Sequence, residues 1–121
     1  MLRWACRAAT CAALLLAGGV LQGCHSIPPP KPLDQLTPVE QSGHAEFVQH
    51  CSTCHHDRTA DPLNGPGLAG LFKKPYLPSG APANDERVRN TVIHGRGNMP
   101  PQGYTMTDAE LNDLLHYLHT L

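Results

Sequence analysis

Two cysteines and a histidine, Cys51, Cys54 and His55, stand in the order Cys-x-x-Cys-His. Residues three apart lie on the same side of a helical turn, so both thiols can reach the two vinyl groups on one edge of a porphyrin. The residue after the second cysteine is then carried beneath the ring, where its imidazole can bind iron. The pattern is typical of covalent haem attachment. It predicts one haem c, held by Cys51 and Cys54, with His55 as its proximal ligand.

Three other chemistries use paired cysteines: a disulfide, a thioredoxin-like redox pair and half of a zinc site. A zinc site needs a second Cys/His pair at ligand spacing, and the sequence offers only scattered histidines for it. A redox pair is expected in a βαβ context, and no β-rich alternation surrounds this run. No disulfide is predicted either, because the assignments below use every cysteine.

The first 23 residues have the pattern of an export signal. Arg3 and Arg7 give it a positive start, and residues 8–20 form an apolar run. This run is shorter than the about 20 apolar residues that a membrane-spanning helix needs. It leads into Leu-Gln-Gly-Cys, which resembles the lipobox of bacterial lipoproteins and predicts a lipid-modified Cys24. The alternatives are an ordinary signal cleaved nearby and an uncleaved anchor.

The five cysteines and the charges fit this processing. Cys6 and Cys11 leave with the signal, Cys24 carries lipid, and the remaining two cysteines carry haem. The mature chain, residues 24–121, keeps seven Lys/Arg against ten Asp/Glu, a formal charge of −3 before the two haem propionates. A net negative charge favours neither binding to nucleic acid nor electrostatic attachment of the protein to membranes.

The mature chain is expected to be a tether followed by one domain. In the tether, residues 24–36, the prolines from Pro28 to Pro32 predict a solvated polyproline II segment. Such a segment would hold the domain about 35 Å from the bilayer. The domain, residues 37–121, is too short for a strong core, so the haem is expected to form the centre of the core.

Three helices are expected and no segment has the pattern of a strand, so the predicted fold class is all-α. The first helix is capped by Thr37, has proline at its first position and runs to about His50, where it delivers the cysteines to the haem. The second begins at Asn84 and ends before Gly95, and the third begins at Thr107. Their apolar faces are predicted to be Ala45, Phe47 and Val48; Val88, Val92 and Ile93; and Leu111, Leu114, Leu115 and Leu118.

An iron that carries electrons without binding small molecules needs a second axial ligand, and a thioether there raises the reduction potential. Met99 lies in Gly-Arg-Gly-Asn-Met-Pro-Pro, which has no helical or core periodicity. Met106 has a structural explanation, because it is placed to pack against Leu111 at the start of the last helix. Met99 is therefore the favoured ligand and Met106 its main competitor. The histidines that offer a bis-histidine alternative are His44, His50 and His94.

Residues 38–121 resemble the monohaem class I cytochrome c family. Gly43 and Phe47, eight and four residues before the first haem cysteine, fit the family's first helix, and Leu114 and Tyr117 fit its last. The resemblance implies that these helices cross in close contact, with the glycine letting the backbones approach. It also implies a small class I cytochrome c-like fold with three to four helices around one covalently attached haem.

The loops resemble the family as well. Residues 65–68, Gly-Pro-Gly-Leu, are similar to its Gly-Pro-x-Leu loop. This implies that the Pro66 carbonyl accepts a hydrogen bond from His55 and that Leu68 packs on the haem face. The stretch around Met99 is similar to the distal methionine motif, which implies Met99 as the sixth ligand. The candidate partners of the haem propionates, unless they are simply solvated, are Arg58, Arg96 and Tyr104.

Together these expectations describe a membrane-anchored c-type cytochrome that carries single electrons and is not an enzyme. Its partners would be redox proteins of a respiratory or dehydrogenase chain, and the lipid on Cys24 would hold it on the periplasmic side of a bacterial membrane, inner or outer. The alternative is a haem enzyme or gas sensor with an open distal site, such as a peroxidase, with polar groups from His94 or Arg96. A structural lipoprotein with a coincidental Cys-x-x-Cys-His run is the third interpretation.

Overall fold

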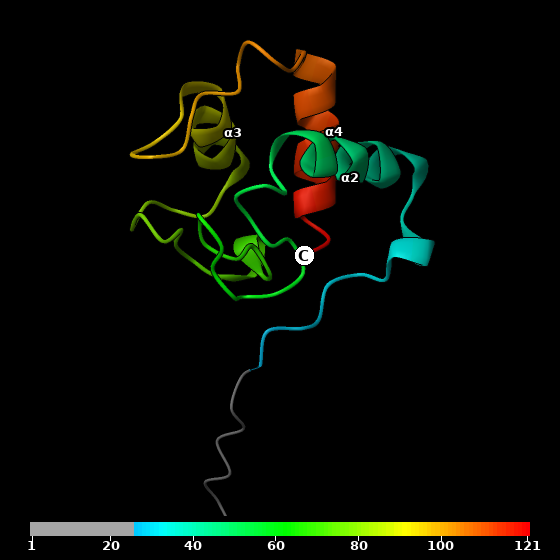
Figure 1. The fold of residues 1–121 in the computed structure, drawn as a ribbon. Coiled ribbons are helices and arrows are strands. Elements are labelled where there is room, and N and C mark those ends of the chain that lie inside the picture. Colours follow the sequence, from blue (N-terminus) through cyan, green and yellow to red (C-terminus); the bar gives the residue numbers. More distant parts are fainter. Residues whose placement is uncertain (1–25) are drawn as a thin grey trace, which may run out of the picture.

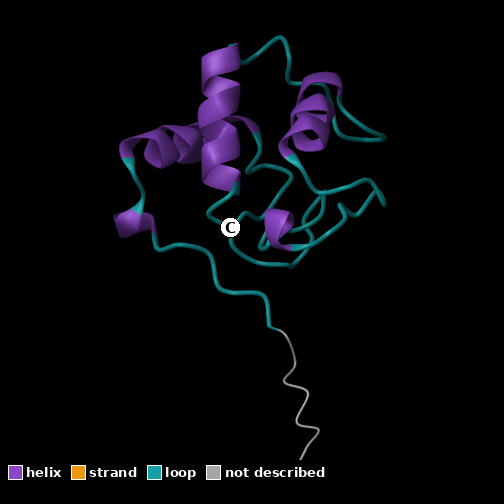
Figure 2. Cartoon of the chain, turned by 180° about the vertical axis from the view of Figure 1, so that it is seen from behind, coloured by secondary structure: helices purple, strands orange, loops and turns teal. Residues whose placement is uncertain are grey.

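The computed structural model describes residues 26–121, and every regular element in that range is helical (Figures 1 and 2). The predicted signal peptide and Cys24 lie outside the described residues. The all-α prediction is confirmed: between residues 26 and 121, extended pairing is limited to two isolated bridges. No helix in this range is both long and apolar enough to cross a bilayer. The elements are η1 (Leu33–Gln35), α2 (Pro38–His50), η2 (Leu71–Lys73), α3 (Asp85–His94) and α4 (Asp108–Leu118).

Helices α2 and α4 cross at the centre of the molecule and make its main helix–helix contact (Figure 1). Gly43 is buried at the crossing, where a Cβ would overlap the Asp113 carbonyl and lie 2.8 Å from the Tyr117 Cβ. The buried rings of Phe47 and Tyr117 pack beside it, with centroids 5.9 Å apart. Position 43 must lack a side chain for the backbones to come this close. This is the crossing that the family resemblance implies.

Helix α2 buries a narrower face than the sequence predicts. Phe47 is buried, but Ala45 is exposed and Val48 keeps 53% of its exposure. The buried positions are Gly43 and Phe47, one turn apart. The predicted apolar face was wrong for Ala45 and Val48, because a helix that crosses its neighbour near one point buries the residues at that point and not a continuous stripe.

The predicted helix starts are all present. The hydroxyls of Thr37 and Thr107 accept from the backbone N–H three residues on, while the Glu40 and Glu110 carboxylates accept from the threonine N–H groups at 2.7 Å. Asn84 caps α3 by accepting a backbone N–H at 2.9 Å. These caps fix the first turns and align each helix for packing. The buried core consists of Leu36, Phe47, Val88, Val92, Leu111, Leu114, Leu115, Tyr117, Leu118 and Leu121.

Residues 27–36, called the strap below, run along the domain. The Lys31 N–H donates to the Thr120 carbonyl at 2.8 Å, and the Arg58 guanidinium donates to the Lys31 carbonyl at 2.8 Å. At the end of the strap, Leu36 is buried in the core. Residues 28, 29 and 32–35 are exposed, as expected of a solvated segment, but the segment is not free of the domain, which supplies partners for the backbone groups of Pro28, Pro30 and Lys31.

Candidate haem site

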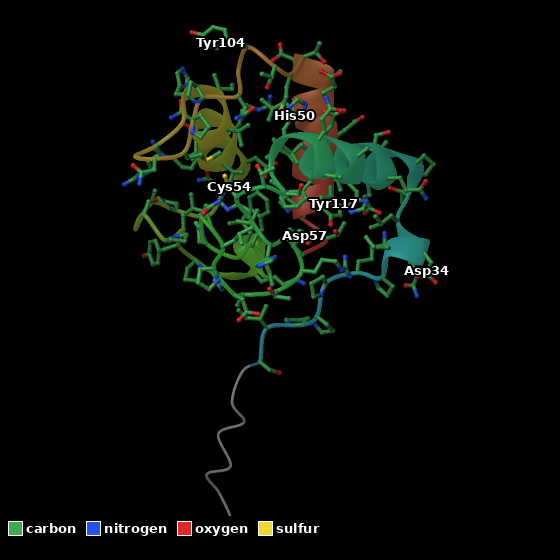
Figure 3. The ribbon with its side chains drawn as sticks, in the orientation of Figure 1. Asp34, His50, Cys54, Asp57, Tyr104 and Tyr117 are labelled. Carbon is green, nitrogen blue, oxygen red and sulfur yellow. The ribbon has the colours of Figure 1, made fainter. Side chains whose placement is uncertain are left out.

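Helix α2 passes directly into the turn that carries both cysteines, and Figure 3 shows Cys54 on the side of the molecule that faces α3. The Cys51 N–H donates to the Phe47 carbonyl at 2.8 Å. The N–H groups of Cys54 and His55 both donate to the Cys51 carbonyl at 3.0 Å. Both thiols are free and half-buried. The backbone thus keeps the two sulfurs on one turn, as attachment to neighbouring vinyl groups requires.

The electrostatics of this turn do not suit thiol redox exchange. Burial raises the pKa of the Cys51 thiol to about 11, and the charges of Cys54 and Glu46 act in the same direction. A thioredoxin-like pair needs a lowered pKa, because the thiolate is the nucleophile. Within residues 26–121, no three His, Cys, Asp or Glu side chains are grouped to hold an ion. The geometry therefore favours thioether attachment over the redox pair and the zinc site.

The imidazole of His55 is fixed by the loop that follows it. Its Nδ1 lies 2.8 Å from the Pro66 carbonyl oxygen, so a protonated Nδ1 donates to that carbonyl. The Gly65 N–H donates to the Cys54 carbonyl at 2.7 Å and closes the loop beside the ring. A Cβ on Gly65 would lie 2.8 Å from Nδ1, so only glycine leaves room here. With Nδ1 bonded to the backbone, Nε2 carries the lone pair that can bind a metal.

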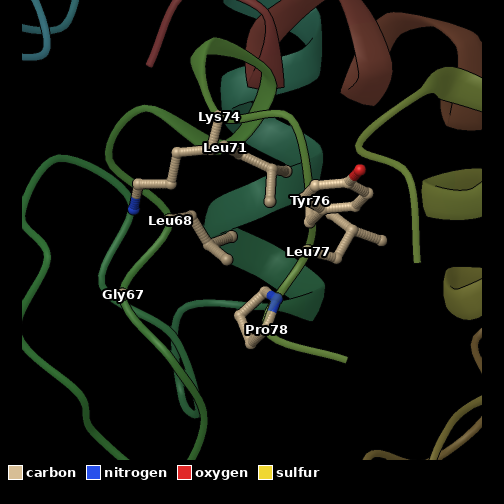
Figure 4. A pocket seen from close by; sticks show the side chains of 7 residues that line it. All are labelled: Gly67, Leu68, Leu71, Lys74, Tyr76, Leu77 and Pro78. Atoms are coloured by element: carbon tan, nitrogen blue, oxygen red, sulfur yellow. The ribbon is translucent and has the colours of Figure 1, made fainter. Parts of the chain in front are cut away.

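An apolar hollow of about 170 Å³ opens beside the same loop (Figure 4). Leu68, which the family resemblance places on the haem face, is on its wall, and the Leu68 N–H donates to the His56 carbonyl at 2.8 Å. Hydrocarbon dominates the lining, so the hollow suits an apolar group better than a polar ligand. The lining residues are Gly67, Leu68, Leu71, Lys74, Tyr76, Leu77 and Pro78.

Met99 lies on a tight loop that follows α3. Gly95 ends the helix with φ 73°, a conformation that favours glycine. Arg96 and Met99 then exchange two backbone hydrogen bonds, of 3.1 and 3.0 Å. The Met99 side chain is half-buried and packs against the core, as does Met106 directly before the α4 cap. Met99 is thus held on the inner side of a closed turn, a position suited to an axial ligand.

The other histidines considered as iron ligands all have partners elsewhere in the described chain. The His44 ring lies 4.9 Å from the Tyr117 ring, between centroids, and the His94 Nδ1 lies 3.1 Å from a carbonyl of its own helix. The Nε2 of His50 lies 3.5 Å from the Glu46 carboxylate. These contacts explain the positions of the three histidine side chains, and none of them needs to bind iron.

Of the residues considered as propionate partners, Arg58 uses one of its two terminal guanidinium nitrogens to hold the strap. Its Nη2 donates to the Pro30 and Lys31 carbonyls of the strap, at 3.3 and 2.8 Å. Its Nη1 is buried without a partner. Arg96 and Tyr104 are exposed, with 93% exposure for Tyr104.

One contact beside the haem turn was not predicted from the sequence. The Tyr117 hydroxyl donates to the Asp57 carboxylate, and Figure 3 shows the two side chains meeting below α2. Burial and the Asp57 carboxylate raise the pKa of Tyr117 well above its usual value, so the hydroxyl remains a donor. The pair links the segment after His55 to α4. No local pattern joins residues so far apart in the chain.

These groups fit a covalently attached haem. The chain offers two thiols on one turn, an imidazole oriented through its other nitrogen, and apolar walls beside it. A half-buried thioether on a separate loop completes the donor set. This combination of sulfur, imidazole and thioether donors is the one that haem c uses.

Residues 38–118 match the family model described as cytochrome c oxidase, cbb3-type, subunit III. The chain belongs to this family. No curated protein matches the cytochrome. Among solved structures, cytochrome c6 from the diatom Phaeodactylum tricornutum aligns at 23% identity and a TM-score of 0.48, over 65% of this chain and 88% of that one.

Family membership makes the chain a monohaem c-type cytochrome, with covalently attached haem c and a function in electron transfer. Its partners are therefore redox proteins, and members of the cytochrome c family are generally carriers and not enzymes. The haem supplies the one-electron change at its iron, while the chain binds and orients the haem and sets its surroundings.

Proposed function

We propose that this cytochrome is a membrane-anchored periplasmic carrier of single electrons, with His55 and Met99 as the axial ligands of the iron. Cys51 and Cys54 hold the ring, and lipid on Cys24 holds the protein at the membrane. A six-coordinate iron has no vacant position for substrates, so electrons pass through the exposed edge of the haem. The donor and acceptor are components of a respiratory or dehydrogenase chain, in keeping with the oxidase subunit that the family model describes.

The observation that carries the proposal is the hydrogen bond between His55 and Pro66. A histidine that binds metal almost always donates its other N–H to a carbonyl or carboxylate, which fixes the ring and strengthens the ligand. The 2.8 Å separation of Nδ1 from the Pro66 oxygen meets that requirement. Support for Met99 comes from the two backbone bonds to Arg96, which hold the residue in place with its side chain against the core.

Replacement of Met99 by alanine tests the ligand set. Loss of the thioether should lower the reduction potential markedly and should let the reduced iron bind carbon monoxide. Met106→Ala is the matched control, because Met106 is also half-buried against the core, and it should change neither property. Unchanged values in Met99→Ala would show that another residue is the ligand. A parent protein with high-spin, peroxide-reactive ferric iron would instead favour the enzyme or gas sensor.

The partner is expected to dock on the loops around the haem. Residues 62–106 carry five Lys/Arg and two Asp/Glu, whereas the other described residues carry two Lys/Arg and eight Asp/Glu. In Figure 1 the first group occupies the side of α3, opposite the α2 and α4 crossing. Two of the five positive charges, Lys73 and Lys74, lie at η2. The remaining residues of this group carry three Arg against two Asp/Glu, a formal +1 before the two propionates are added, so the charges select neither an acidic nor a basic partner surface.

The lipid anchor is tested by mass spectrometry of the mature protein purified from membranes. We expect an N-terminal Cys24 that carries acyl chains. A signal cleaved at another residue, or one still attached, would contradict the anchor and leave the haem ligands unaffected.

A further inference from the structure

The strap connects the proposed lipid anchor to the haem domain, and it is bonded to the domain at several points. Lys31 contributes two of them: its N–H donates to the Thr120 carbonyl at 2.8 Å, and its ammonium lies 2.6 Å from the Glu40 carboxylate. Arg58 adds two more through the Pro30 and Lys31 carbonyls. These bonds remove the freedom that a solvated polyproline spacer would have.

The strap leaves the domain beside η2. The Ile27 side chain lies over the buried Gly70, so that a Cβ on Gly70 would contact the Ile27 methyl groups. The Lys73 ammonium donates to the Pro28 carbonyl at 3.2 Å. Lys74 follows and is exposed, and Ile27 itself keeps 42% of its exposure. We call Ile27, Gly70, Lys73 and Lys74 the exit face.

The distance between the anchor and the exit face is limited by covalent geometry. Cys24 is three residues from Ile27, and an extended chain spans at most about 3.6 Å per residue, so the two lie within about 11 Å. A released strap in polyproline II conformation would instead allow about 35 Å between the lipid and the domain. Docking of the strap therefore fixes which face of the domain is nearest the membrane.

We propose that the docked strap holds the exit face against the bilayer, where Lys73 and Lys74 contact anionic phospholipid headgroups. The inference rests on the proposed lipid at Cys24. Ile27 adds an exposed apolar side chain at the interface, and the two lysines are attracted by the negative surface potential of anionic lipids. The acidic net charge does not prevent this contact, because exposed charges beyond a Debye length of about 8 Å are screened.

This orientation leaves the opposite side of the domain free for a redox partner. Figure 3 shows Tyr104, on the loop between α3 and α4, on the side away from the point where the strap leaves the domain. The loop that carries Met99 belongs to the same α3–α4 connection. The membrane would therefore not cover the distal loop.

Quenching of a fluorescent lipid by the haem tests the orientation. The lipidated cytochrome is reconstituted in phosphatidylcholine vesicles, with or without phosphatidylglycerol, that carry a headgroup fluorophore emitting within the haem absorption band. Because energy transfer falls steeply with distance, the parent should quench strongly. Twelve Gly/Ser residues inserted between His25 and Ser26 add a root-mean-square length of about 20 Å and should reduce quenching several-fold. Arg58→Ala combined with Glu40→Gln removes both Arg58 bonds and the Lys31 ion pair, which weakens the attachment of the strap, and it should reduce quenching as well.

The lysines are tested by Lys73→Gln combined with Lys74→Gln. Quenching by the parent should increase when phosphatidylglycerol is included, and quenching by this variant should not. If quenching by the parent protein is the same with and without phosphatidylglycerol, the proposed contact with anionic headgroups is overturned. Equal quenching by the parent and the insertion variant, with both bound to vesicles, would overturn the held orientation and leave the anchor intact. A parent that does not float with the vesicles would overturn the anchor and this inference together.

Discussion

Substitution of Gly43 by alanine should destabilise the cytochrome, although alanine is the better helix former by about 1 kcal/mol. The added Cβ would overlap the Asp113 carbonyl and lie 2.8 Å from the Tyr117 Cβ. The carbonyl is α4 backbone, so it cannot rotate away as a flexible side chain would. Overpacking of a tight contact typically costs about 1–3 kcal/mol, and an obstacle in the backbone places this one at the upper end. After the helix-propensity gain, we expect a net loss of about 2 kcal/mol.

Thermal unfolding of the haem-loaded protein, followed by far-ultraviolet circular dichroism, measures this effect. For a domain of this size, about 2 kcal/mol corresponds to a midpoint lowered by roughly 8–16 °C. Ser42→Ala is the matched control: the residue is exposed on the same helix, and the substitution adds helix propensity without a collision. A Gly43→Ala variant as stable as the control would refute the close crossing of α2 and α4.

Three further predictions concern other contacts of the domain. Gly65→Ala should displace the ring of His55 and break its bond to the Pro66 carbonyl. The imidazole then becomes a weaker electron donor to the iron, so the reduction potential should rise in a potentiometric titration. An unchanged potential would contradict a role for Gly65 in holding the ring. Tyr117→Phe leaves the Asp57 Oδ2 without its donor, while Oδ1 still accepts from the Arg58 N–H. The substitution should lower the free energy of unfolding by about 1–3 kcal/mol in a denaturant titration, whereas no loss would show that the bond is not formed. The hydrogen bond from the Lys31 ammonium, together with that from the Thr37 N–H, lowers the pKa of the Glu40 carboxyl from its ordinary value. The stabilisation by this carboxylate is therefore present above the ordinary pKa of a glutamate and is lost as pH falls through the lowered pKa. Glu40→Gln should make acid unfolding less steep, and an unaltered acid profile would exclude the contribution.

Much of the fold could be predicted because its signals are local. The capping boxes at Thr37 and Thr107 and the glycine stop after α3 depend on residues within one turn, and the structure has them at those positions. The haem turn is equally local, since three residues of fixed spacing determine where the sulfurs and the imidazole stand. The same holds for the apolar face of α4, where every position of the repeat is buried.

The strap, the narrow face of α2 and the Asp57–Tyr117 bond could not be predicted, because each depends on segments that are remote in sequence. Proline-rich composition indicates an extended backbone, but it does not show that Arg58 and the C-terminal backbone will bond to it. Val48 has the polarity of a core residue and is exposed only because α4 crosses α2 elsewhere. Such outcomes follow from tertiary packing, which local propensity does not encode.

The proposed function requires the iron to lie between the imidazole of His55 and the thioether of Met99. A proton NMR spectrum of the reduced, haem-loaded cytochrome tests this ligand pair, because the methyl group of a bound methionine lies over the ring and its resonance is shifted far upfield. We predict one such resonance in the parent, its loss in Met99→Leu and its retention in Met106→Leu. Retention of the resonance in Met99→Leu, or its absence from the parent, would contradict the assignment.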